Sequence, residues 1–496
     1  MARTLIGLDL GTTLCKAVLV NERLSLLGAA EKEYPLITLS ESRSEQDARQ
    51  WWSVASEVIR GLFGGSGRRP EDVRALSISA QGISFVPVDC ECRPLRNALT
   101  WLDARALSQR RQILEQFPEP ELFRLTGKRA GLAYVLPKLL WLMQEEPGIY
   151  EQAYRILMAL DFLVARMCGT FVTDHTMASG TMFYDIQQRS WCAPILRRFG
   201  IEEGKLPQLR QSGTEVGALL PRAARELGLS TMTLVVVGGQ DQKVAALAAG
   251  SDLDRTTISL GTAMAITQKC TRPVIDPLMR IPCFSDLLPD RWVLEASGIA
   301  TGALDWLKRT LFPTRSYDDL NAMVLAEEER ANRVFMFPFF AGPDTMHQGE
   351  ELTGFIHGLD LSVSAGQIVR SLFEGISYQV RENIELLETL SAPVKELRVF
   401  GGGSRSPAWC QILADVTARP VLTFPTSEMG GMGAAMLAGI GAGVLRDFEE
   451  AVGCLEIGDR YAPRPGPASR YDELFQQYLE IQARNLGSPE SERGAP

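Results

Sequence analysis

Histidine is scarce in this sequence, and motifs of several common enzyme classes are missing. The chain has three histidines, His175, His347 and His357, which argues against imidazole-built metal sites and most serine–histidine–aspartate chemistry. The nine cysteines are scattered without a C-x-x-C pair, as expected for free thiols in a reducing compartment. There is no G-x-x-x-x-G-K followed by serine or threonine, no G-x-S-x-G and no complete G-x-G-x-x-G. These absences argue against a P-loop nucleotidase, an α/β-hydrolase and a standard dinucleotide enzyme.

Positive charge and long apolar runs are also in short supply. The 51 Lys and Arg against 60 Asp and Glu give a net charge of −9, so the chain has no electrostatic footprint for nucleic acid. The first 16 residues carry Asp9 inside an apolar stretch, unlike a signal peptide. The longest uncharged run, residues 429–445, holds six glycines and suits a tightly packed helix better than a membrane span. We therefore expect a cytoplasmic enzyme with neither a nucleic-acid nor a membrane partner.

The length of 496 residues predicts two to four domains with sizeable hydrophobic cores. Short apolar strands alternate with helical patterns, which is typical of the α/β class. Strands are expected over residues 73–79, 85–88, 233–237 and 396–400. Helices are expected over residues 122–145 with a break near Pro137, and over 154–168, 243–249 and 407–418.

A short pattern, Leu-Gly-Thr, recurs in the two halves of the chain. It begins at Leu10 between two apolar runs and again at Leu260, 250 residues later, in the same setting. Each copy predicts a hairpin with the glycine and threonine in its turn. A three-residue match can arise by chance, but a spacing of half the chain length suggests two homologous domains.

The two predicted turns are candidate phosphate sites. Gly11, Thr12 and Thr13 offer backbone N–H groups and hydroxyls in a tight bend, which can hold a phosphate without a basic patch. Gly261 and Thr262 offer the same groups from the other half. The alternative is that both are plain hairpin turns.

Two charged residues lie close to the first turn. Lys16 could add one positive charge there, and Asp9 precedes the turn in an otherwise apolar strand. Asp9 could hold Mg²⁺ through water, because this ion prefers carboxylates and keeps several waters. The alternative is a carboxylate on a solvated strand edge.

An acid follows directly after the apolar strand that ends near residue 237. Such a position is a common location for a catalytic group, and Asp241 could accept or orient a hydroxyl proton. Asp is also among the best helix N-caps, so a capping role is the alternative.

Two further segments are candidates for ligand contact. Residues 401–404 are three glycines and a serine, which would let a flat ligand lie on the backbone. The helix that follows, with Ser406 as its predicted N-cap, would favour phosphate. Trp101, Asp103 and Arg105 combine an aromatic face with charged hydrogen-bond partners and suit a polyhydroxylated ligand. The alternatives are a turn without ligand and a core tryptophan beside a surface salt bridge.

Taken in order, these segments resemble the FGGY family of carbohydrate kinases, whose members have two actin-like (ribonuclease H-like) α/β domains and an interdomain cleft. The resemblance extends from about residue 5 to residue 445. It is carried by residues 7–13, 45–47, 78–82, 101–105, 173–179, 238–242, 259–262, 354–359, 401–407 and 433–438. The resemblance implies an ATP-dependent sugar kinase with an N-terminal domain over residues 1–244, a C-terminal domain over 245–485 and a disordered tail at 486–496.

The resemblance also implies roles for individual residues. Asp241 would accept the proton of the attacking sugar hydroxyl, and Asp9 would lie on the Mg²⁺ side. The nucleotide would contact Thr12, Thr13, Lys16, Gly261 and Thr262 with its phosphates, and Gly302, Gly402 and Gly403 with its adenine side. The sugar would contact Gln81, Gly82, Trp101, Asp103, Arg105, Asp241 and Gln242.

The pattern is most similar to the xylulokinase branch of the family, which implies D-xylulose as the substrate. Gln81, Gly82 and Ile83 depart from it, because xylulokinases commonly have Gln-Met-His there. The departure predicts a roomier or less polar pocket and leaves another ketose, a polyol or a sugar acid open, as in glycerol-, fuculose- or gluconate-type kinases. An actin-like ATPase without sugar kinase activity is the alternative from another class. The resemblance also allows a homodimer.

Overall fold

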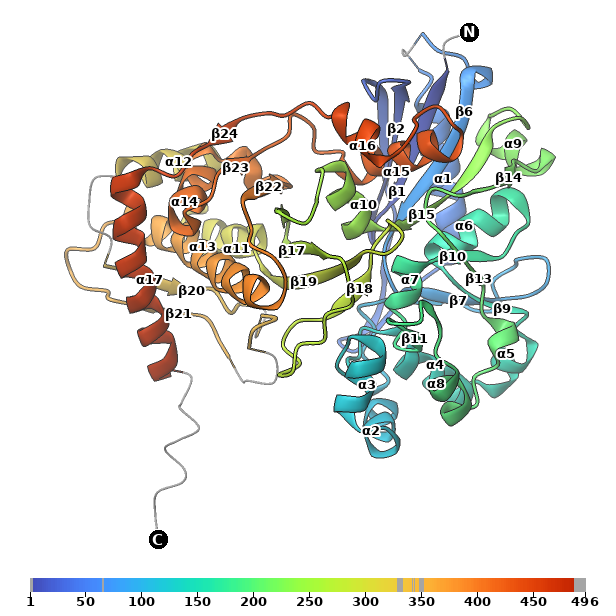
Figure 1. Ribbon diagram of the computed structural model, residues 1–496, viewed down its shortest axis with the longest axis horizontal. Helices are drawn as coiled ribbons and strands as arrows, with labels where there is room; N and C mark the ends of the chain where they lie inside the picture. The colour runs from blue at the N-terminus through green and yellow to red at the C-terminus, as the bar shows by residue number, and fades with distance from the viewer. Residues whose placement is uncertain are drawn as a thin grey trace. The chain divides into compact units, whose positions relative to one another are not determined.

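The computed structural model describes residues 3–64, 67–327, 333–340, 342, 344–347 and 352–485 (Figure 1). The chain forms two compact units. The first comprises Met1–Gly250, Cys270–Val293 and Glu428–Leu455, and the second comprises Ser251–Lys269, Leu294–Ser427 and Glu456–Pro496. Each unit is therefore discontinuous in sequence. The domain boundary between residues 244 and 245 stays a prediction, and the predicted tail at 486–496 lies outside the described residues.

The larger sheet of the first unit has six strands in the order β14-β15-β6-β1-β2-β3. The strands are β1 (Thr4–Leu10), β2 (Leu14–Asn21), β3 (Leu26–Glu33), β6 (Val73–Ala80), β14 (Glu215–Ala218) and β15 (Leu234–Gln240). β1, β2 and β3 pair antiparallel, whereas β6 lies parallel to both β1 and β15. The carboxyl ends of β1, β6 and β15 thus meet at one edge, and the segments that follow them start from that edge.

Alternation along β1 places different residues on the two faces of this sheet. Ile6, Leu8 and Leu10 join the main hydrophobic core together with helix α1 (Ala48–Gly61). Gly7 and Asp9 face helix α15 (Met429–Gly441), which lies against β1 in Figure 1. A β-carbon on Gly7 would stand 1.8 Å from the carbonyl oxygen of Gly431, so glycine permits this backbone contact.

A second, five-stranded sheet of the first unit has the order β4-β5-β8-β7-β9. Its strands are β4 (Ile37–Ser40), β5 (Arg43–Gln46), β7 (Phe85–Val88), β8 (Ala98–Leu99) and β9 (Arg155–Met158). Helices α2 (Leu107–Gln116), α3 (Glu119–Thr126), α4 (Val135–Glu145) and α5 (Pro147–Gln152) belong to the same region. The loop from β8 to α2 carries Trp101, Asp103 and Arg105.

The remaining elements of the first unit are short connections and two buried helices. α6 (Ala159–Cys168) and α10 (Asp241–Ala248) both contact β15. The others are β10 (Val172–Asp174), α7 (His175–Ser179), β11 (Tyr184–Asp185), β12 (Ser190–Trp191), α8 (Ala193–Phe199), β13 (Gln208–Arg210), α9 (Pro221–Leu227), β18 (Cys283–Ser285) and α16 (Phe448–Gly453), with 3-10 turns at Pro70–Asp72 and Glu203–Lys205.

Two sequence predictions in this unit are wrong. The helix expected over 154–168 is the strand β9 followed by α6, because residues 155–158 pair antiparallel with β7. The helical break expected near Pro137 lies earlier, between α3 and α4. Pro137 stands in the first turn of α4, where its missing N–H has no intrahelical partner to lose.

The sheet of the second unit contains the strand order β19-β17-β16-β22-β23-β24. These are β16 (Arg255–Leu260), β17 (Ala263–Cys270), β19 (Trp292–Ile299), β22 (Glu396–Phe400), β23 (Val421–Leu422) and β24 (Arg460–Tyr461). β16 pairs antiparallel with β17 and parallel with β22, which repeats the relation of β1 to β2 and β6. The structure thus confirms both hairpins and gives them equivalent places in two sheets.

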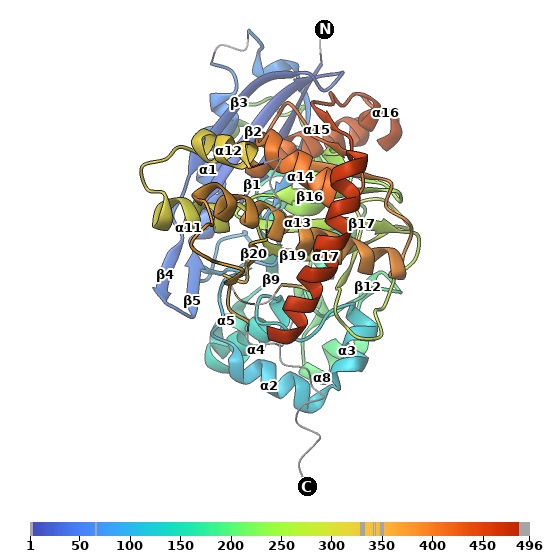
Figure 2. The ribbon, with the colours of Figure 1, turned by 90° about the vertical axis from the view of Figure 1, so that its left-hand side faces the viewer.

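Helices of the second unit pack beside this sheet, and Figure 2 shows them in colours from yellow (α11 and α12) to red (α17). The 26-residue α13 contacts α12 and α14, and α14 contacts α17. Ser406 caps α14 through Trp409 N–H, as predicted. The elements are α11 (Thr301–Leu311), α12 (Tyr317–Ala326), β20 (Phe335–Phe337), β21 (Phe355–His357), α13 (Ala365–Leu390), α14 (Pro407–Thr417) and α17 (Pro465–Asn485), with a 3-10 turn at Gly402–Arg405.

No helix in the described part of the chain combines the length and the apolar character that crossing a bilayer requires. The uncharged run 429–445 instead forms the buried helix α15 and the turn after it. Its glycines permit close contact with β1, which is a packing requirement.

Candidate functional site

The first predicted phosphate turn joins β1 to β2. Gly11 N–H donates to the carbonyl of Leu14 at 3.0 Å and closes the turn, while Thr13 is exposed. Thr12 Oγ1 accepts a hydrogen bond from the indole Nε1 of Trp101 at 2.9 Å. The turn therefore combines exposed hydroxyl and backbone groups with an aromatic side chain.

Asp9 lies at the end of β1 on the face covered by α15. Ser79 Oγ donates to Asp9 Oδ1 at 2.6 Å, and a β-carbon on Gly430 would stand 2.4 Å from Asp9 Oδ2. The first turn of α15 thus lies directly on this carboxylate, an arrangement that favours negative charge. Burial raises the pKa of Asp9, and the Ser79 hydrogen bond and Lys16 oppose that effect.

Lys16 stands opposite Asp9 in the β1–β2 register. Its Nζ lies 3.1 Å from Glu428 Oε1 and 3.8 Å from Glu31 Oε2. The ammonium is therefore shared between carboxylates. No group of three His, Cys, Asp or Glu side chains within the described ranges is placed to hold a metal ion.

A buried hydrogen-bond network connects the phosphate turn with the predicted sugar loop. Gln81 is 1% exposed, and its Nε2 donates to Gln46 Oε1 at 2.8 Å and to Tyr34 Oη at 3.2 Å. Tyr34 Oη in turn donates to the carbonyl of Gly11, and Gln46 Nε2 donates to that of Thr12. Gln81 therefore contacts the phosphate turn through two intermediates.

The same network reaches Trp101 from the other end of Gln81. Ser84 Oγ donates to Gln81 Oε1 at 3.1 Å and accepts from Trp101 N–H at 3.1 Å. Because Trp101 Nε1 also bonds to Thr12, the hydrogen bonds form a closed circuit through both segments. Trp101 remains 40% exposed, which leaves part of its ring accessible to a ligand.

Asp103 and Arg105 form a buried ion pair. Arg105 Nε lies 2.9 and 3.0 Å from the two carboxylate oxygens of Asp103, and its Nη2 lies 2.8 Å from Glu45 Oε1. The two side chains are 0% and 4% exposed. Asp103 Oδ2 also accepts from Ser44 N–H at 2.8 Å. The pair is thus directed into the protein.

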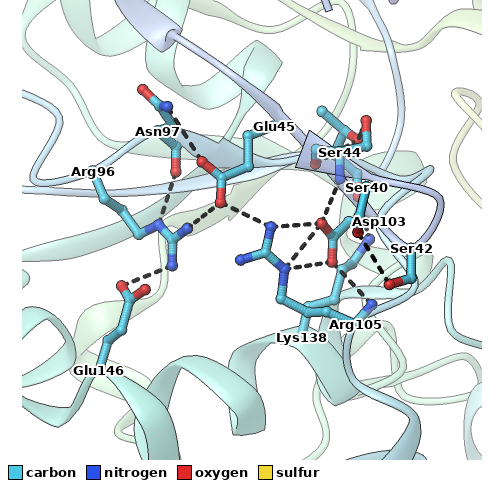
Figure 3. Close-up of polar contacts among 11 residues, drawn as sticks. Ser40, Ser42, Ser44, Glu45, Arg96, Asn97, Asp103, Arg105, Lys138 and Glu146 are labelled. Carbon is cyan, nitrogen blue, oxygen red and sulfur yellow. Dashed lines mark hydrogen bonds and ion pairs between the residues drawn. The ribbon is translucent and has the colours of Figure 1, made fainter. Parts of the chain in front are cut away.

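Figure 3 shows that this pair belongs to a larger network in which opposite charges alternate. Glu45 lies between the guanidinium groups of Arg105 and Arg96, and Arg96 reaches Glu146 at 2.7 Å. The centre of the Trp141 ring lies 4.7 Å from the Arg105 guanidinium carbon and 5.5 Å from that of Arg96. Such pairing offsets the cost of burying the charges.

Lys138 fixes the loop that carries Trp101. Its buried Nζ donates to the carbonyls of Thr100 at 2.7 Å and Ala133 at 2.6 Å. Burial lowers the pKa of Lys138 to about 7, with Asp103 opposing the shift. Lys138 thus connects α4 to the residue that precedes Trp101.

Asp241 is the first residue of α10, and Gln240 is the residue that caps this helix. Gln240 Oε1 accepts from Lys243 N–H at 3.4 Å, so the capping role considered for Asp241 belongs to its neighbour. Gln242 N–H donates to Asp241 Oδ1 at 2.7 Å, and Gln240 Nε2 donates to the same oxygen. These contacts orient the carboxylate.

The loop at Gly82 and Ile83, where the sequence predicts a roomier or less polar pocket, has close neighbours in the structure. A β-carbon on Gly82 would stand 3.0 Å from Gln240 Cγ, so Gln240 already fills the room that a larger residue would need. Ile83 has φ of 56°, a strained conformation for a β-branched residue, and packs on Gly180. The roomier or less polar pocket stays a prediction, and the structure adds that a long-range neighbour, Gln240, lies beside position 82.

The predicted nucleotide residues of the second unit come together. Gly302 N–H donates to the carbonyl of Thr262 at 3.1 Å, and Thr301 N–H donates to that of Gly261 at 2.8 Å, so the second turn lies at the start of α11. A cavity of about 370 Å³ lies beside Thr301, Asn321, Gly402, Gly403, Ser406 and Trp409. Its size falls within the range of small-molecule sites.

Several residues of the site are not singled out by any motif in the sequence. Tyr34, Gln46, Ser79 and Gln240 all contact predicted site residues directly. Gln46 and Gln240 lay within segments that carry the family resemblance, but nothing local distinguished them from other polar residues. Ser79 lies in another of these segments, residues 78–82, and Tyr34 alone among the four had no sequence signal.

Both halves of the chain match the same protein family. The N-terminal domain of the FGGY family of carbohydrate kinases matches residues 4–248, and its C-terminal domain matches residues 256–442. The chain belongs to this family. It is an ATP-dependent sugar kinase with the two-domain, actin-like α/β fold of that family.

Several relatives of the chain are xylulose kinases. The chain is 31% identical to a xylulose kinase of Bacillus subtilis (strain 168) over 482 residues, covering 96% of each chain. It is 29% identical to a xylulose kinase of Escherichia coli (strain K12), covering 96% of this chain and all of that one. The crystal structure of a xylulose kinase from Rhodospirillum rubrum has a TM-score of 0.88 and 26% identity, covering 97% and 99% of the two chains.

Proposed function

We propose that this kinase phosphorylates a small ketose of the xylulose type at the site around Trp101 and Asp241. The hydrogen bond from Trp101 Nε1 to Thr12 Oγ1 carries the proposal, because it fixes a partly exposed indole beside a turn that can hold phosphate. Indole faces stack on the apolar faces of sugars. The xylulose kinases among the relatives support this choice of substrate.

In the proposed mechanism Asp241 accepts the proton of the attacking hydroxyl. Phosphoryl transfer has a loose transition state, so positioning and charge neutralisation matter more than the strength of the base. Asp241 suits this role because the Gln240 side-chain Nε2 and the Gln242 backbone N–H both donate to its Oδ1 and fix its orientation. Gln242 itself would lie at the sugar.

The nucleotide would be held mainly by backbone and hydroxyl groups. In this proposal the phosphate contacts are Thr12, Thr13, Lys16, Gly261 and Thr262. The cavity beside Gly402 and Gly403, with Gly302 nearby, would accept the adenine side of ATP. Helix and turn N–H groups can stabilise phosphate without a basic patch.

Asp9 would be the protein ligand on the Mg²⁺ side. A single carboxylate suits this ion, which keeps several waters and takes its other ligands from the substrate phosphates. When bound, Mg²⁺ would neutralise charge on those phosphates. Ser79 and the first turn of α15 hold the Asp9 carboxylate for this purpose.

The sugar site would also depend on three buried residues, Gln81, Asp103 and Arg105, which lie beneath the surface of the pocket. Their polar groups bond to Gln46, Ser84, Ser44 and Glu45, so we propose that they position Trp101 and its loop. Gly82 would form the floor of the pocket beside Gln240.

Another ketose is the second candidate substrate. The observation that favours it is Gln240 filling the space at Gly82, where xylulokinases commonly place a larger residue. Such a difference next to Asp241 would change which arrangement of sugar hydroxyl groups fits beside this carboxylate.

A coupled assay of ADP release over ketoses, polyols and sugar acids tests the proposal. We expect release that depends on sugar, with the highest kcat/KM for a ketose. Fast ADP release that is unchanged by every sugar would contradict the proposal and favour an actin-like ATPase.

A further inference from the structure

The side chain of Gln240 lies between the sugar loop and the proposed proton acceptor. A β-carbon added to Gly82 would stand 3.0 Å from Gln240 Cγ and 3.3 Å from its Nε2, and its three nearest neighbours all belong to Gln240. The same Nε2 donates to Asp241 Oδ1. One side chain thus contacts both the loop and the carboxylate.

Gln240 is held at both ends of its side-chain amide and at its backbone. Its Oε1 accepts from Lys243 N–H at 3.4 Å, its Nε2 donates to Asp241, and its N–H donates to Thr176 Oγ1 at 2.8 Å. A glutamine amide with separate partners for its oxygen and its nitrogen has one favourable orientation. Gln240 has little freedom to turn away from Gly82.

Thr176, which accepts the hydrogen bond from the Gln240 backbone, is itself fixed by a buried carboxylate. Thr176 Oγ1 donates to Asp174 Oδ2 at 2.6 Å, and Ser212 Oγ donates to the same oxygen at 3.0 Å. Asp174 also accepts from Met177 N–H at 3.0 Å, as the cap of α7. A side chain at position 82 that displaces Gln240 would therefore disturb its contact with Asp241 more readily than its contact with Thr176.

The backbone at Gly82 does not by itself require glycine. Its φ lies outside the left-handed region, unlike that of Gly127, where φ is 74°. Alanine would be acceptable at position 82 on conformational grounds. The obstacle to a side chain is therefore contact with Gln240.

We propose that Gln240 is a positioning residue for Asp241, and that Gly82 is required because it leaves the room that Gln240 occupies. The inference rests on the proposed role of Asp241 as proton acceptor. Two donors on Asp241 Oδ1, from Gln240 and from Gln242 N–H, set the rotation of the carboxylate. A shift of Gln240 would rotate it away from the sugar hydroxyl.

The test is a suppressor experiment with Gly82→Ala, Gln240→Ala and the double variant. We expect Gly82→Ala to lower kcat/KM by about 10-fold, since the new methyl group would displace Gln240 by a few tenths of an ångström and a displacement of about 1 Å costs about 100-fold in a positioned site. Gln240→Ala loses the hydrogen bond to Asp241 as well as the one that caps α10, and it should cost about 10-fold. The double variant should match Gln240→Ala alone, because the atoms that the new methyl group would contact are gone.

Two further variants serve as controls. Gly204→Ala introduces a methyl group with nothing within 4 Å and should leave kcat/KM unchanged. Gln240→Met keeps most of the side-chain volume and loses the donor, so Gly82→Ala should remain harmful in that background. The ratio of kcat/KM for different ketoses should change in Gln240→Ala, which loss of stability alone would not cause.

The possible results separate this inference from the proposed function. A wild-type protein without sugar-dependent ADP release would overturn the proposed function and the role of Gln240 with it. An active wild type in which Gly82→Ala is harmless would overturn this inference alone, as would effects of Gly82→Ala and Gln240→Ala that simply multiply. If Gly82→Ala does not fold, a folded and active double variant would still support the inference, and an unfolded one would overturn it.

Discussion

The indole nitrogen of Trp101 donates a hydrogen bond to Thr12 Oγ1 at 2.9 Å, across 89 positions of sequence. Trp101 belongs to the loop after β8, and Thr12 to the turn between β1 and β2. Gln81 connects the same two segments from beneath, through Gln46 and Ser84. The proposed sugar and phosphate contacts are therefore built on one hydrogen-bonded framework.

Trp101→Phe should raise the sugar KM about fivefold, because it keeps an aromatic ring but loses a hydrogen bond worth about 1 kcal/mol. The affinity for ATP should change little. Trp52→Phe is the matched control, since the Trp52 indole bonds to Glu226 away from the site. Steady-state kinetics over sugar concentration would check this, and equal KM values in wild type and Trp101→Phe would contradict it.

Asp241→Asn should lower kcat by at least about 1000-fold, because the side chain keeps its shape but cannot take the hydroxyl proton. Nucleotide affinity, measured by calorimetry with a non-hydrolysable ATP analogue, should stay within about twofold. Asp290→Asn, at an exposed position, should leave both quantities unchanged. Wild-type turnover in Asp241→Asn would remove Asp241 from the proposed mechanism.

Asp9→Asn should raise the Mg²⁺ concentration needed for half-maximal activity by about 10-fold, since an amide is a weaker ligand than a carboxylate for this ion. The measurement is an Mg²⁺ titration at fixed ATP. Glu31→Gln removes a nearby exposed carboxylate and serves as the control. Identical titration curves for Asp9→Asn and wild type would rule out the proposed role of Asp9.

Asp103→Asn should reduce the free energy of unfolding by about 3 kcal/mol, because it leaves the buried Arg105 with one fewer carboxylate. Glu91→Gln breaks an exposed ion pair with Arg93 and should cost less than about 1 kcal/mol. Urea unfolding of the two variants checks the contrast. Similar losses in both would show that burial of the Asp103–Arg105 pair does not matter.

Lys138 should make stability depend on pH above neutrality. Burial lowers its pKa to about 7, whereas an unfolded lysine keeps its proton up to a pH of about 10.4. Above pH 7 the unfolded chain therefore binds more protons at Lys138 than the folded chain does. The contribution of Lys138 to the free energy of unfolding rises with pH as a result. Below pH 7 both states are protonated and the contribution is constant.

Urea unfolding of wild type and Lys138→Met at pH 7, 8 and 9 tests this expectation. The stability of wild type relative to the variant should increase over this range, by at most about 1.4 kcal/mol per pH unit. Lys32→Met, at an exposed site, is the control and should show no such trend. A constant difference between wild type and Lys138→Met would contradict the lowered pKa.

Much of the framework could be predicted from local sequence. The hairpins at Leu10 and Leu260, the strand before Asp241 and the helix capped by Ser406 follow from alternation, turn residues and capping, which act over a few positions. The segment 154–168 could not be predicted in this way. Residues 155–158 are a strand because β7 pairs with them, and that partner is about 70 positions away.

The sequence by itself determined the repeated hairpin, the order of the site segments and hence the family, because these depend on residue types at fixed spacing. Only the tertiary structure decided that Gln240 fills the space beside Gly82 and that Asp103 and Arg105 point into a buried ion network. It also decided that Tyr34 and Gln46 support the phosphate turn. The physical reason is that a side chain's partners are set by packing between distant segments, which no local pattern records.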